Sequence, residues 1–297
     1  KGWIPLEDDV TALEPVAPAT QRAIFAFGTT GSVTNISSLV NSSGVVGSDV
    51  SGVGSARTTV AAVSYGGDKA IYSYGSSADS NLVSNQGVVA ADVTGVGTNQ
   101  NRRVGCPYGG DKGIFSYTNS TNETNLVSNQ GVIASSVTGV GTNRDAMGGA
   151  GFGSANSRGI WAYGQGGYNI SNLISTTGVV SSNVSGVGTA RYNLCGTMFG
   201  GDQGIFGYGY DWTTITNKVS NTGVVATDTS GAGTNAYDKG AAPYGGDKGI
   251  FAFGQLEGVG LSSITNLISN TGVTASNTTG VGVARKELAG AGYSFSA

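Results

Sequence analysis

The stretch Ile250-Phe251-Ala252-Phe253 consists of an isoleucine, an aromatic residue, a small residue and a second aromatic residue. The same four-residue motif, which we call the aromatic phrase, occurs five more times, at Ile24–Phe27, Ile71–Tyr74, Ile114–Tyr117, Ile160–Tyr163 and Ile205–Tyr208. The steps between successive isoleucines are 47, 43, 46, 45 and 45 residues. A nearly constant period of this size indicates one supersecondary unit repeated along the whole chain.

Each repeat has the pattern of four short strands. In the second repeat, a small apolar stretch at 58–65 is followed by the turn signal Gly66-Gly67-Asp68 and by the aromatic stretch 69–74. Two further β-prone stretches follow, at 81–87 and 88–93. No stretch shows a helical apolar period. Four strands in about 45 residues are typical of one blade of a β-propeller, so we expect an all-β fold.

The stretch before each aromatic phrase is made of small residues, as expected for a strand that lines a narrow central channel. The small residues are Ala61-Ala62, Gly105-Cys106, Gly149-Ala150, Cys195-Gly196 and Ala241-Ala242. The two cysteines occupy this position, and we expect buried free thiols because a disulfide scaffold needs more cysteines.

The chain ends predict how the ring closes. The first aromatic phrase has no small-residue strand before it, but such a strand occurs at 288–295, where Tyr293 aligns with Tyr65 and Tyr244. We therefore predict a six-bladed β-propeller of four-stranded blades over residues 21–297, with the first blade completed by the C-terminal strand. Closure removes the open sheet edges. A right-handed solenoid of strands is the alternative. Residues 1–20 lie outside the repeat, as an N-terminal arm.

The order of signals in each unit resembles kelch repeats. Glycine pairs occur at Gly66-Gly67, Gly109-Gly110, Gly200-Gly201 and Gly245-Gly246, and an arginine precedes the inner strand at Arg57, Arg144, Arg191 and Arg285. The chain departs from the kelch pattern because its glycine pair lies before the aromatic strand. The resemblance implies the propeller architecture.

A second resemblance is closer in amino-acid sequence. The stretches Tyr108–Phe115 and Tyr244–Phe251, joined to Thr124–Asn129 and Thr138–Thr142, look like repeats of virion structural proteins of tailed bacteriophages. The resemblance implies a structural, decoration or adhesion component of a phage particle, located in the virion and bound to other virion proteins. A lectin-like, extracellular propeller that binds a cell-surface glycan is the alternative.

Composition argues against several other classes of function. The chain has no histidine, which removes the usual general base and nearly all zinc sites, so we expect no enzyme, cofactor or metal. Charged residues are 11% of the chain and the net charge is -3, so we expect no nucleic-acid partner. No stretch is long and apolar enough to predict a membrane span.

Aspartates recur at the same turn in four repeats: Asp68, Asp111, Asp202 and Asp247. We expect them to stabilise the turn, since Asp bonds its own backbone there. The alternative is a ring of charge that binds an anionic glycan or a symmetric partner.

Function on a repeat scaffold is expected where the repeats differ, which is the loop after the aromatic strand. The candidate ligand- or partner-binding residues are Tyr168, Tyr210, Asp211, Trp212, Leu256 and Glu257. The structural alternative is that Tyr210 and Trp212 only cover a blade edge. In the arm, Trp3, Ile4 and Leu6 are candidate docking residues.

Overall fold

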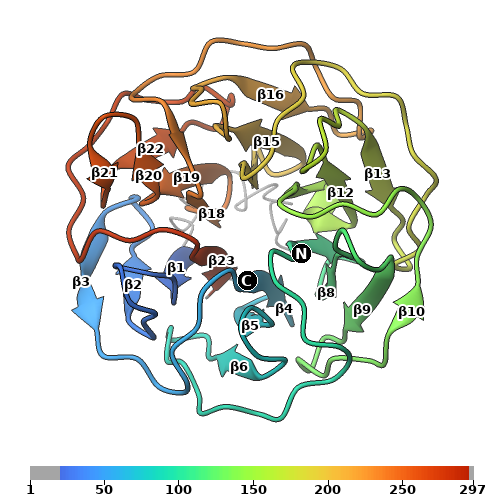
Figure 1. Ribbon diagram of the computed structural model, residues 1–297, viewed down its shortest axis with the longest axis horizontal. Helices are drawn as coiled ribbons and strands as arrows, with labels where there is room; N and C mark the ends of the chain where they lie inside the picture. Colours follow the sequence, from blue (N-terminus) through green and yellow to red (C-terminus); the bar gives the residue numbers. More distant parts are fainter. Residues whose placement is uncertain (1–20, 294–297) are drawn as a thin grey trace, which may run out of the picture.

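The computed structural model describes residues 21–293, and nearly all of its regular structure is antiparallel β-sheet. A single 3-10 turn, η2 (Ser154–Asn156), is the exception within these residues. Six of the seven sheets in this part of the chain each contain one aromatic phrase, and they are arranged around a central axis (Figure 1). The all-β propeller prediction is confirmed, and these six sheets are called blades 1 to 6.

The strands of each blade are given from the axis outward. Blade 1 contains β23 (Ala289–Tyr293), β1 (Arg22–Ala26), β2 (Ser37–Val40) and β3 (Val46–Val50); blade 2 contains β4 (Ala61–Tyr65), β5 (Lys69–Ser73) and β6 (Ser80–Val83); blade 3 contains β7 (Gly105–Tyr108), β8 (Lys112–Phe115), β9 (Glu123–Val127) and β10 (Val137–Thr138). Blade 4 contains β11 (Gly148–Phe152), β12 (Arg158–Ala162) and β13 (Ser171–Ile174); blade 5 contains β14 (Cys195–Phe199), β15 (Gln203–Gly207) and β16 (Thr216–Val219); blade 6 contains β18 (Gly240–Tyr244), β19 (Lys248–Ala252) and β22 (Thr265–Ile268). The seventh sheet is small and consists of β17 (Ala236–Tyr237), β20 (Gln255–Leu256) and β21 (Gly260–Leu261).

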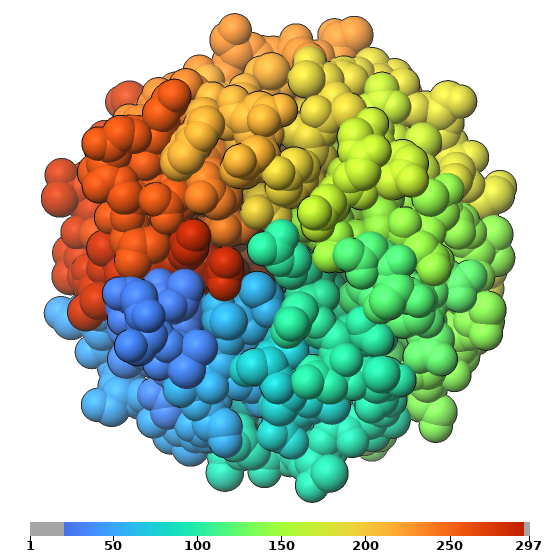
Figure 2. Space-filling view, in the orientation of Figure 1, coloured from blue at the N-terminus to red at the C-terminus, as the bar shows by residue number. Residues whose placement is uncertain are grey.

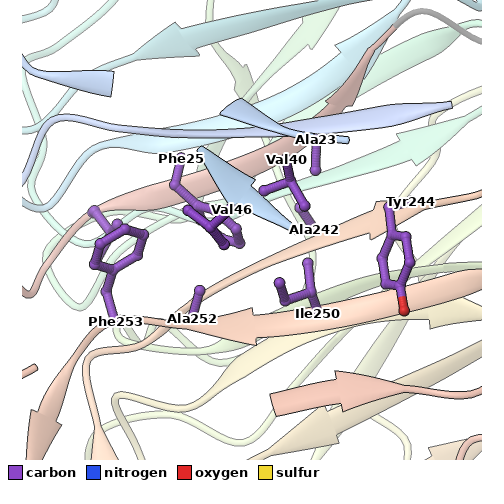
Figure 3. Close-up of a cluster of buried hydrophobic side chains, with 10 residues drawn as sticks. Ala23, Phe25, Val40, Val46, Ala242, Tyr244, Ile250, Ala252 and Phe253 are labelled. Carbon is purple, nitrogen blue, oxygen red and sulfur yellow. The ribbon is translucent and has the colours of Figure 1, made fainter. Parts of the chain in front are cut away.

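The two ends of the described chain meet in blade 1. Strand β23 pairs antiparallel with β1, from Arg22 opposite Tyr293 to Ala26 opposite Ala289. The first and last repeats therefore lie side by side, as their blue and red colours show in Figure 2. Figure 3 shows the core between them, where side chains of blades 1 and 6 face one another. The predicted completion of blade 1 by the C-terminal strand is confirmed.

The inner strands approach one another through their backbones, which requires small residues. A Cβ added to Gly149 would lie 2.6 Å from the carbonyl oxygen of Gly105. The next inner strand repeats this contact, because a Cβ on Gly196 would lie 2.6 Å from the carbonyl oxygen of Gly149. The prediction of small-residue inner strands is thereby confirmed. The free cysteines Cys106 and Cys195 are both buried, as expected.

Aromatic rings fill the space between blades further from the axis. The second ring of each phrase packs against the first ring of the next phrase, in edge-to-face or tilted geometry with centroids 5.3–5.8 Å apart. The six pairs are Phe27–Tyr72, Tyr74–Phe115, Tyr117–Trp161, Tyr163–Phe206, Tyr208–Phe251 and Phe253–Phe25. Such pairs contribute about 0.5–1.5 kcal/mol each beyond the area they bury. The last pair joins blade 6 to blade 1.

A buried cation lies in every gap between blades. The six cations are Arg57, Arg103, Arg144, Arg191, Lys239 and Arg285, and each is at most 5% exposed. Each cation lies over the second aromatic ring of the preceding blade, at 4.0–5.7 Å from the ring centroid. The sequence pattern identified four of these arginines but not Arg103 or Lys239.

The arginines also bind the blade that follows. Arg191 donates from Nη2 to Oδ1 of the buried Asn217 at 2.7 Å, and Arg144 binds Asn172 in the same way at 2.7 Å. The amide nitrogen of Asn217 then donates to the carbonyl of Ala226 at 3.0 Å, in the outermost segment of the blade. One chain of contacts therefore runs from an aromatic ring through a cation and an asparagine to the blade edge.

The fourth strand differs from the prediction in most blades. In blades 2, 4, 5 and 6 it is reduced to isolated bridges, such as Ser80 opposite Val93 and Val83 opposite Val89. In these blades the asparagine side chain binds a carbonyl of the outer segment, as Asn81 binds Ala90 at 2.9 Å. Blade 1 has Ser38 at this position and a five-residue fourth strand, β3. The asparagine thus holds the outer segment where the backbone ladder is incomplete.

Replacing a buried cation should destabilise the protein. In Arg191→Met, the Oδ1 of Asn217 and the carbonyl of Tyr208 lose their donors, so we expect a loss of about 2–4 kcal/mol in the free energy of unfolding. Urea denaturation would measure it. The control is Arg158→Met, which changes a half-buried arginine over Phe152 within one blade and should cost under about 1 kcal/mol. Equal effects of the two variants would contradict this role.

Candidate binding face around the central mouth

The variable loops and the entry to the channel lie on one end of the blades. In blade 2, β5 ends at Ser73 opposite Ala61, where β4 begins, so the loop after β5 lies beside the start of the inner strand. The Gly-Gly-Asp turn lies at the other end of the same hairpin, where Tyr65 pairs with Lys69. We call the end with the variable loops the loop face.

Six residues at equivalent repeat positions surround the axis on this face, and we call them the mouth ring. They are Thr59, Arg102, Ala146, Asn193, Asp238 and Glu287, and all six line one cavity. Each backbone amide donates to the carbonyl of the ring residue in the preceding blade, at 2.9–3.3 Å. Because Thr59 donates to Glu287 and Glu287 donates to Asp238, the hydrogen bonds form a closed circle.

All six ring residues have a left-handed backbone, with φ between 52° and 59°. Non-glycine residues adopt this conformation uncommonly, and it costs free energy that the surrounding structure must offset. Glycine and asparagine adopt this conformation most readily. The ring instead carries a different side chain in every blade, which is the pattern expected of a recognition site.

Opposite charges share the cavity. Arg102 donates from Nη1 to Oδ1 of Asn193 at 3.2 Å, so its guanidinium reaches past Ala146. Glu287 accepts a bond from the hydroxyl of Thr58 at 2.7 Å. Burial raises the pKa of Asp238 to about 7, and the neighbouring Glu287 carboxylate acts in the same direction. Burial also lowers the pKa of Lys239, which lines the cavity, to about 8.

An aromatic cluster borders the mouth ring at blades 5 and 6. Tyr210 stacks on Tyr192 at 4.7 Å between centroids and meets Tyr237 edge-on at 5.4 Å. Trp212 packs edge-on against Tyr237 at 4.7 Å. Tyr192 and Tyr237 directly precede the ring residues Asn193 and Asp238 in the sequence. We call these four residues the aromatic cluster. The cluster lies between the exposed surface at Tyr210 and the polar cavity lined by the mouth ring.

The loop that carries this cluster has a strained backbone. Asp211 and Trp212 both have positive φ, at 79° and 55°. Two such residues in succession form a tight turn usually built from glycine or asparagine. Tyr210 is 36% exposed and Asp211 is also exposed. Strain of this kind in a variable loop supports a functional role for its side chains.

The sequence-based candidates occupy different environments. Tyr210, Asp211 and Trp212 lie in the strained loop beside the mouth, whereas Tyr168 lies on the loop of blade 4, over Gly166. Leu256 is 1% exposed and packs in the core between blades 5 and 6. Glu257 is exposed and accepts a bond from Asn235 at 2.7 Å. Trp3, Ile4 and Leu6 lie outside the described residues.

The repeated aspartates lie on the opposite face. Asp68, Asp111 and Asp247 each form an ion pair with the following lysine, at 2.6, 3.0 and 2.9 Å. These side chains are 30–42% exposed, so the pairs contribute at most about 1 kcal/mol each. These contacts are ion pairs with the following lysine, and stabilisation of the turn by a bond from Asp to its own backbone stays a prediction.

Sequence reasoning missed the mouth ring and half of the aromatic cluster. A usable signal was present, because four ring residues follow a buried arginine by two positions, as Thr59 follows Arg57 and Asn193 follows Arg191. This position differs in every repeat, but it lies just before the small-residue strand and outside the loops of unequal length. The left-handed backbone itself has no signature in residues such as Arg102 or Glu287.

Within residues 21–293, no group of three or more His, Cys, Asp or Glu side chains is placed to hold a metal ion. In the same residues, no helix has the length and apolar character needed to cross a membrane.

Comparison with known proteins supports the fold. No family model matches the chain and no curated protein matches it, so neither the kelch nor the phage resemblance gains support. Among solved structures, the chain is similar to a streptogramin B lyase, with a TM-score of 0.52 and 12% identity over 75% of this chain and 70% of that one. It is also similar to a protein of unknown function from Bacteroides caccae, with a TM-score of 0.54 and 9% identity over 92% and 99% of the two chains. At these identities the likeness is one of fold, and the fold is β-propeller-like.

The partly buried carboxyl group of Asp238 should make stability depend on pH. Its pKa is raised from 3.8 to about 7, so between these values the native state holds a proton that the unfolded chain releases. Stability therefore falls as pH rises through this window. Asp238→Asn should stabilise the protein at pH 8 by about 1–3 kcal/mol and have little effect at pH 4, as measured by thermal denaturation. A difference that is the same at both pH values would contradict the shift.

Proposed function

We propose that this propeller is a non-enzymatic adhesion module that binds a glycan on its loop face. The aromatic cluster beside the mouth ring is the observation that carries the proposal. Aromatic rings with a free face can stack on the apolar face of a sugar, while tyrosine hydroxyls and ring side chains can bond its hydroxyl groups.

The composition of the site supports binding rather than catalysis. The chain has no histidine, and burial raises the pKa of both cysteine thiols, which keeps them protonated and poor nucleophiles. The remaining polar groups of the mouth ring differ in charge and size, which suits recognition of one shape. The streptogramin B lyase is an enzyme by name, but it shares only 12% identity with this chain.

We further propose that the module is carried on a phage particle, where it would contact other virion proteins and a cell-surface glycan. The resemblance of the repeats at Tyr108–Phe115 and Tyr244–Phe251 to virion proteins supports this part of the proposal. Mass spectrometry of purified particles from the source would test it: the protein should be present at a fixed ratio to the capsid protein. Its absence from the particles would favour a free extracellular lectin.

A glycan array tests the binding role directly. The wild-type protein should bind a defined set of glycans, and Trp212→Ala should reduce affinity for them at least about tenfold, because it removes the largest aromatic ring of the cluster. The matched control is Tyr168→Ala, which removes an aromatic side chain from a loop on the same face but outside the cluster. Equal losses in both variants, or no binding by the wild type, would contradict the proposal.

A further inference from the structure

The outer edge of blade 1 differs from the outer edges of the other blades. Its outermost strand, β3, has five residues (Figure 1), whereas β10 of blade 3 has two and the remaining blades have isolated bridges there. In blades 2 to 6 an asparagine of the third strand donates to a backbone carbonyl of the outer segment. In blade 1 the equivalent Ser38 binds the side chain of Asp49 instead, at 2.7 Å. The backbone of the outer segment can therefore form a regular strand in this blade.

A second difference lies in the segments that cross from one blade to the next. Each crossing contains a Gly-x-Gly motif, and in five of them the following residue has a hydroxyl group: Ser55, Thr98, Thr142, Thr189 and Thr234. In four of these crossings the hydroxyl bonds an Asp or Asn in the outer segment of the following blade, as Thr189 binds Asp228 at 2.6 Å.

The crossing from blade 6 to blade 1 has Val283 at this position. Its side chain is 51% exposed, and its backbone amide donates to Oδ2 of Asp49 at 2.6 Å. A threonine could make the same backbone bond and add a side-chain bond, as it does in the other crossings. The crossing itself therefore does not account for an exposed valine.

Exposed valines gather along the edge of blade 1. Val45 and Val50 lie at the two ends of β3 and are 61% and 49% exposed, while Val281 and Val283 flank Gly282 and are 48% and 51% exposed. A Cβ added to Gly282 would lie 2.5 Å from Oδ1 of Asp49, so the crossing lies against β3. Exposed apolar side chains gathered in one place mark sites of protein–protein interaction.

The same edge has almost no charge. Asp49 is the one charged residue in the stretches 41–56 and 279–284. Its carboxylate is already bound, since it accepts bonds from the Val283 amide and from Arg285, the latter at 3.4 Å. The edge is thus apolar and polar but uncharged.

The outer side of β3 has no strand beside it in the part of the chain that the structure describes, where β3 pairs with β2 alone. Exposed edge strands are usually protected by Lys, Pro or a bulge, or are covered. Residues 41–56 contain neither Lys nor Pro. A shift in the register with β2, between the pairs Val40–Val46 and Ser38–Asp49, bends β3 without supplying a partner for its outer side. Such an edge is suited to pair with a strand of another chain.

We infer that β3 pairs antiparallel with β3 of a second copy of this chain, so that the two blade 1 sheets join across a two-fold axis. A two-fold contact uses the same surface on both partners, and two identical uncharged edges complement one another in this way. Each chain has a net charge of -3, and a contact at the uncharged edge keeps the charged residues of the two copies apart. A strongly charged partner would instead lose hydration without gaining an ion pair.

The direction of β3 determines how the two copies face. Its first residue, Val46, lies opposite Val40, and its last residue, Val50, lies opposite Ser37. Ser37 in turn lies opposite Ala26, at the end of β1 from which the variable loop leaves. Strand β3 therefore runs toward the loop face, and antiparallel pairing directs the two loop faces to opposite sides of the dimer. With the proposed glycan binding, one dimer would join two glycan-bearing surfaces.

Sedimentation velocity at about 5 to 500 µM protein tests the inference. A five-residue strand spans about 17 Å, so the contact is smaller than the roughly 800 Å² per partner of a stable complex. We therefore expect a reversible dimer with a dissociation constant on the order of 10–100 µM. Val50→Lys should raise this constant at least about tenfold, because it places a charge in the uncharged contact.

The matched control is Val93→Lys. Val93 occupies the equivalent position in blade 2 and is 51% exposed, but it lies in an outer segment that forms only isolated bridges. This variant should dimerise like the wild type. Both variants should unfold at the wild-type urea concentration, since both side chains are exposed. Val283→Thr, which introduces the residue of the other crossings, should weaken the dimer severalfold.

Hydrogen exchange locates the contact without a substitution. The amides of residues 46–50 should exchange more slowly at 500 µM than at 5 µM protein. A chain that remains monomeric at 500 µM would overturn the inference, and so would a dimer that Val50→Lys and Val93→Lys weaken equally or that protects other segments instead of β3. None of these outcomes depends on the glycan array, so the two proposals stand or fall separately.

Discussion

The structure depends on one buried contact that recurs between blades, in which a cation lies on the aromatic ring of one blade and binds the next. Arg191 shows this contact most fully, with its guanidinium over Tyr163 and hydrogen bonds to Tyr208 and Asn217. A buried charge is costly unless its donors are satisfied, so the contact specifies a position for each blade relative to its neighbour. Blade 6 shows the limit of this rule. Lys239 binds only the carbonyl of Phe253, and Oδ1 of Asn266 has no partner.

These contacts require a closed ring. Arg285 belongs to the segment that leads into β23, yet it lies over Phe253 of blade 6 and binds Ser38 of blade 1. The aromatic pair Phe25–Phe253 and the hydrogen bond from the Glu287 amide to the Asp238 carbonyl cross the same boundary. Three layers of contact, at the axis, in the core and near the rim, therefore depend on the pairing of β1 with β23.

The sequence predicted the features that recur and missed those that vary. The aromatic phrase and the small residues before it revealed the period, the inner strands and the closure, because the same packing constraint acts in every blade. The fourth strand was overestimated, because its residues have β propensity but Asn81 and its counterparts take over part of the pairing by side-chain bonds. Tyr192, Tyr237 and the mouth ring were missed, because their role depends on the meeting of distant repeats. Tyr168 and Trp212 both follow the aromatic phrase of their repeat, and only the structure shows that Trp212 packs against Tyr237 whereas Tyr168 lies outside the cluster.

The division between scaffold and site follows from the same logic. Side chains that recur in every repeat pack in the gaps between blades. The six mouth-ring residues occupy one equivalent position in each repeat, and they differ in every blade and line the cavity. The ring holds these residues in a left-handed conformation through backbone bonds that do not depend on their side chains. The side chains at the mouth can therefore change without change to the scaffold, which suits the proposed adhesion module.

Cooperative unfolding of two shortened chains tests the closure most directly. One chain ends at Tyr293 and keeps β23, and the other ends at Glu287 and lacks it. The account predicts a single cooperative urea transition for the longer chain and loss of that transition for the shorter one, since every boundary contact of blade 1 would be weakened together. A shorter chain that unfolds at the same urea concentration and with the same steepness would contradict it.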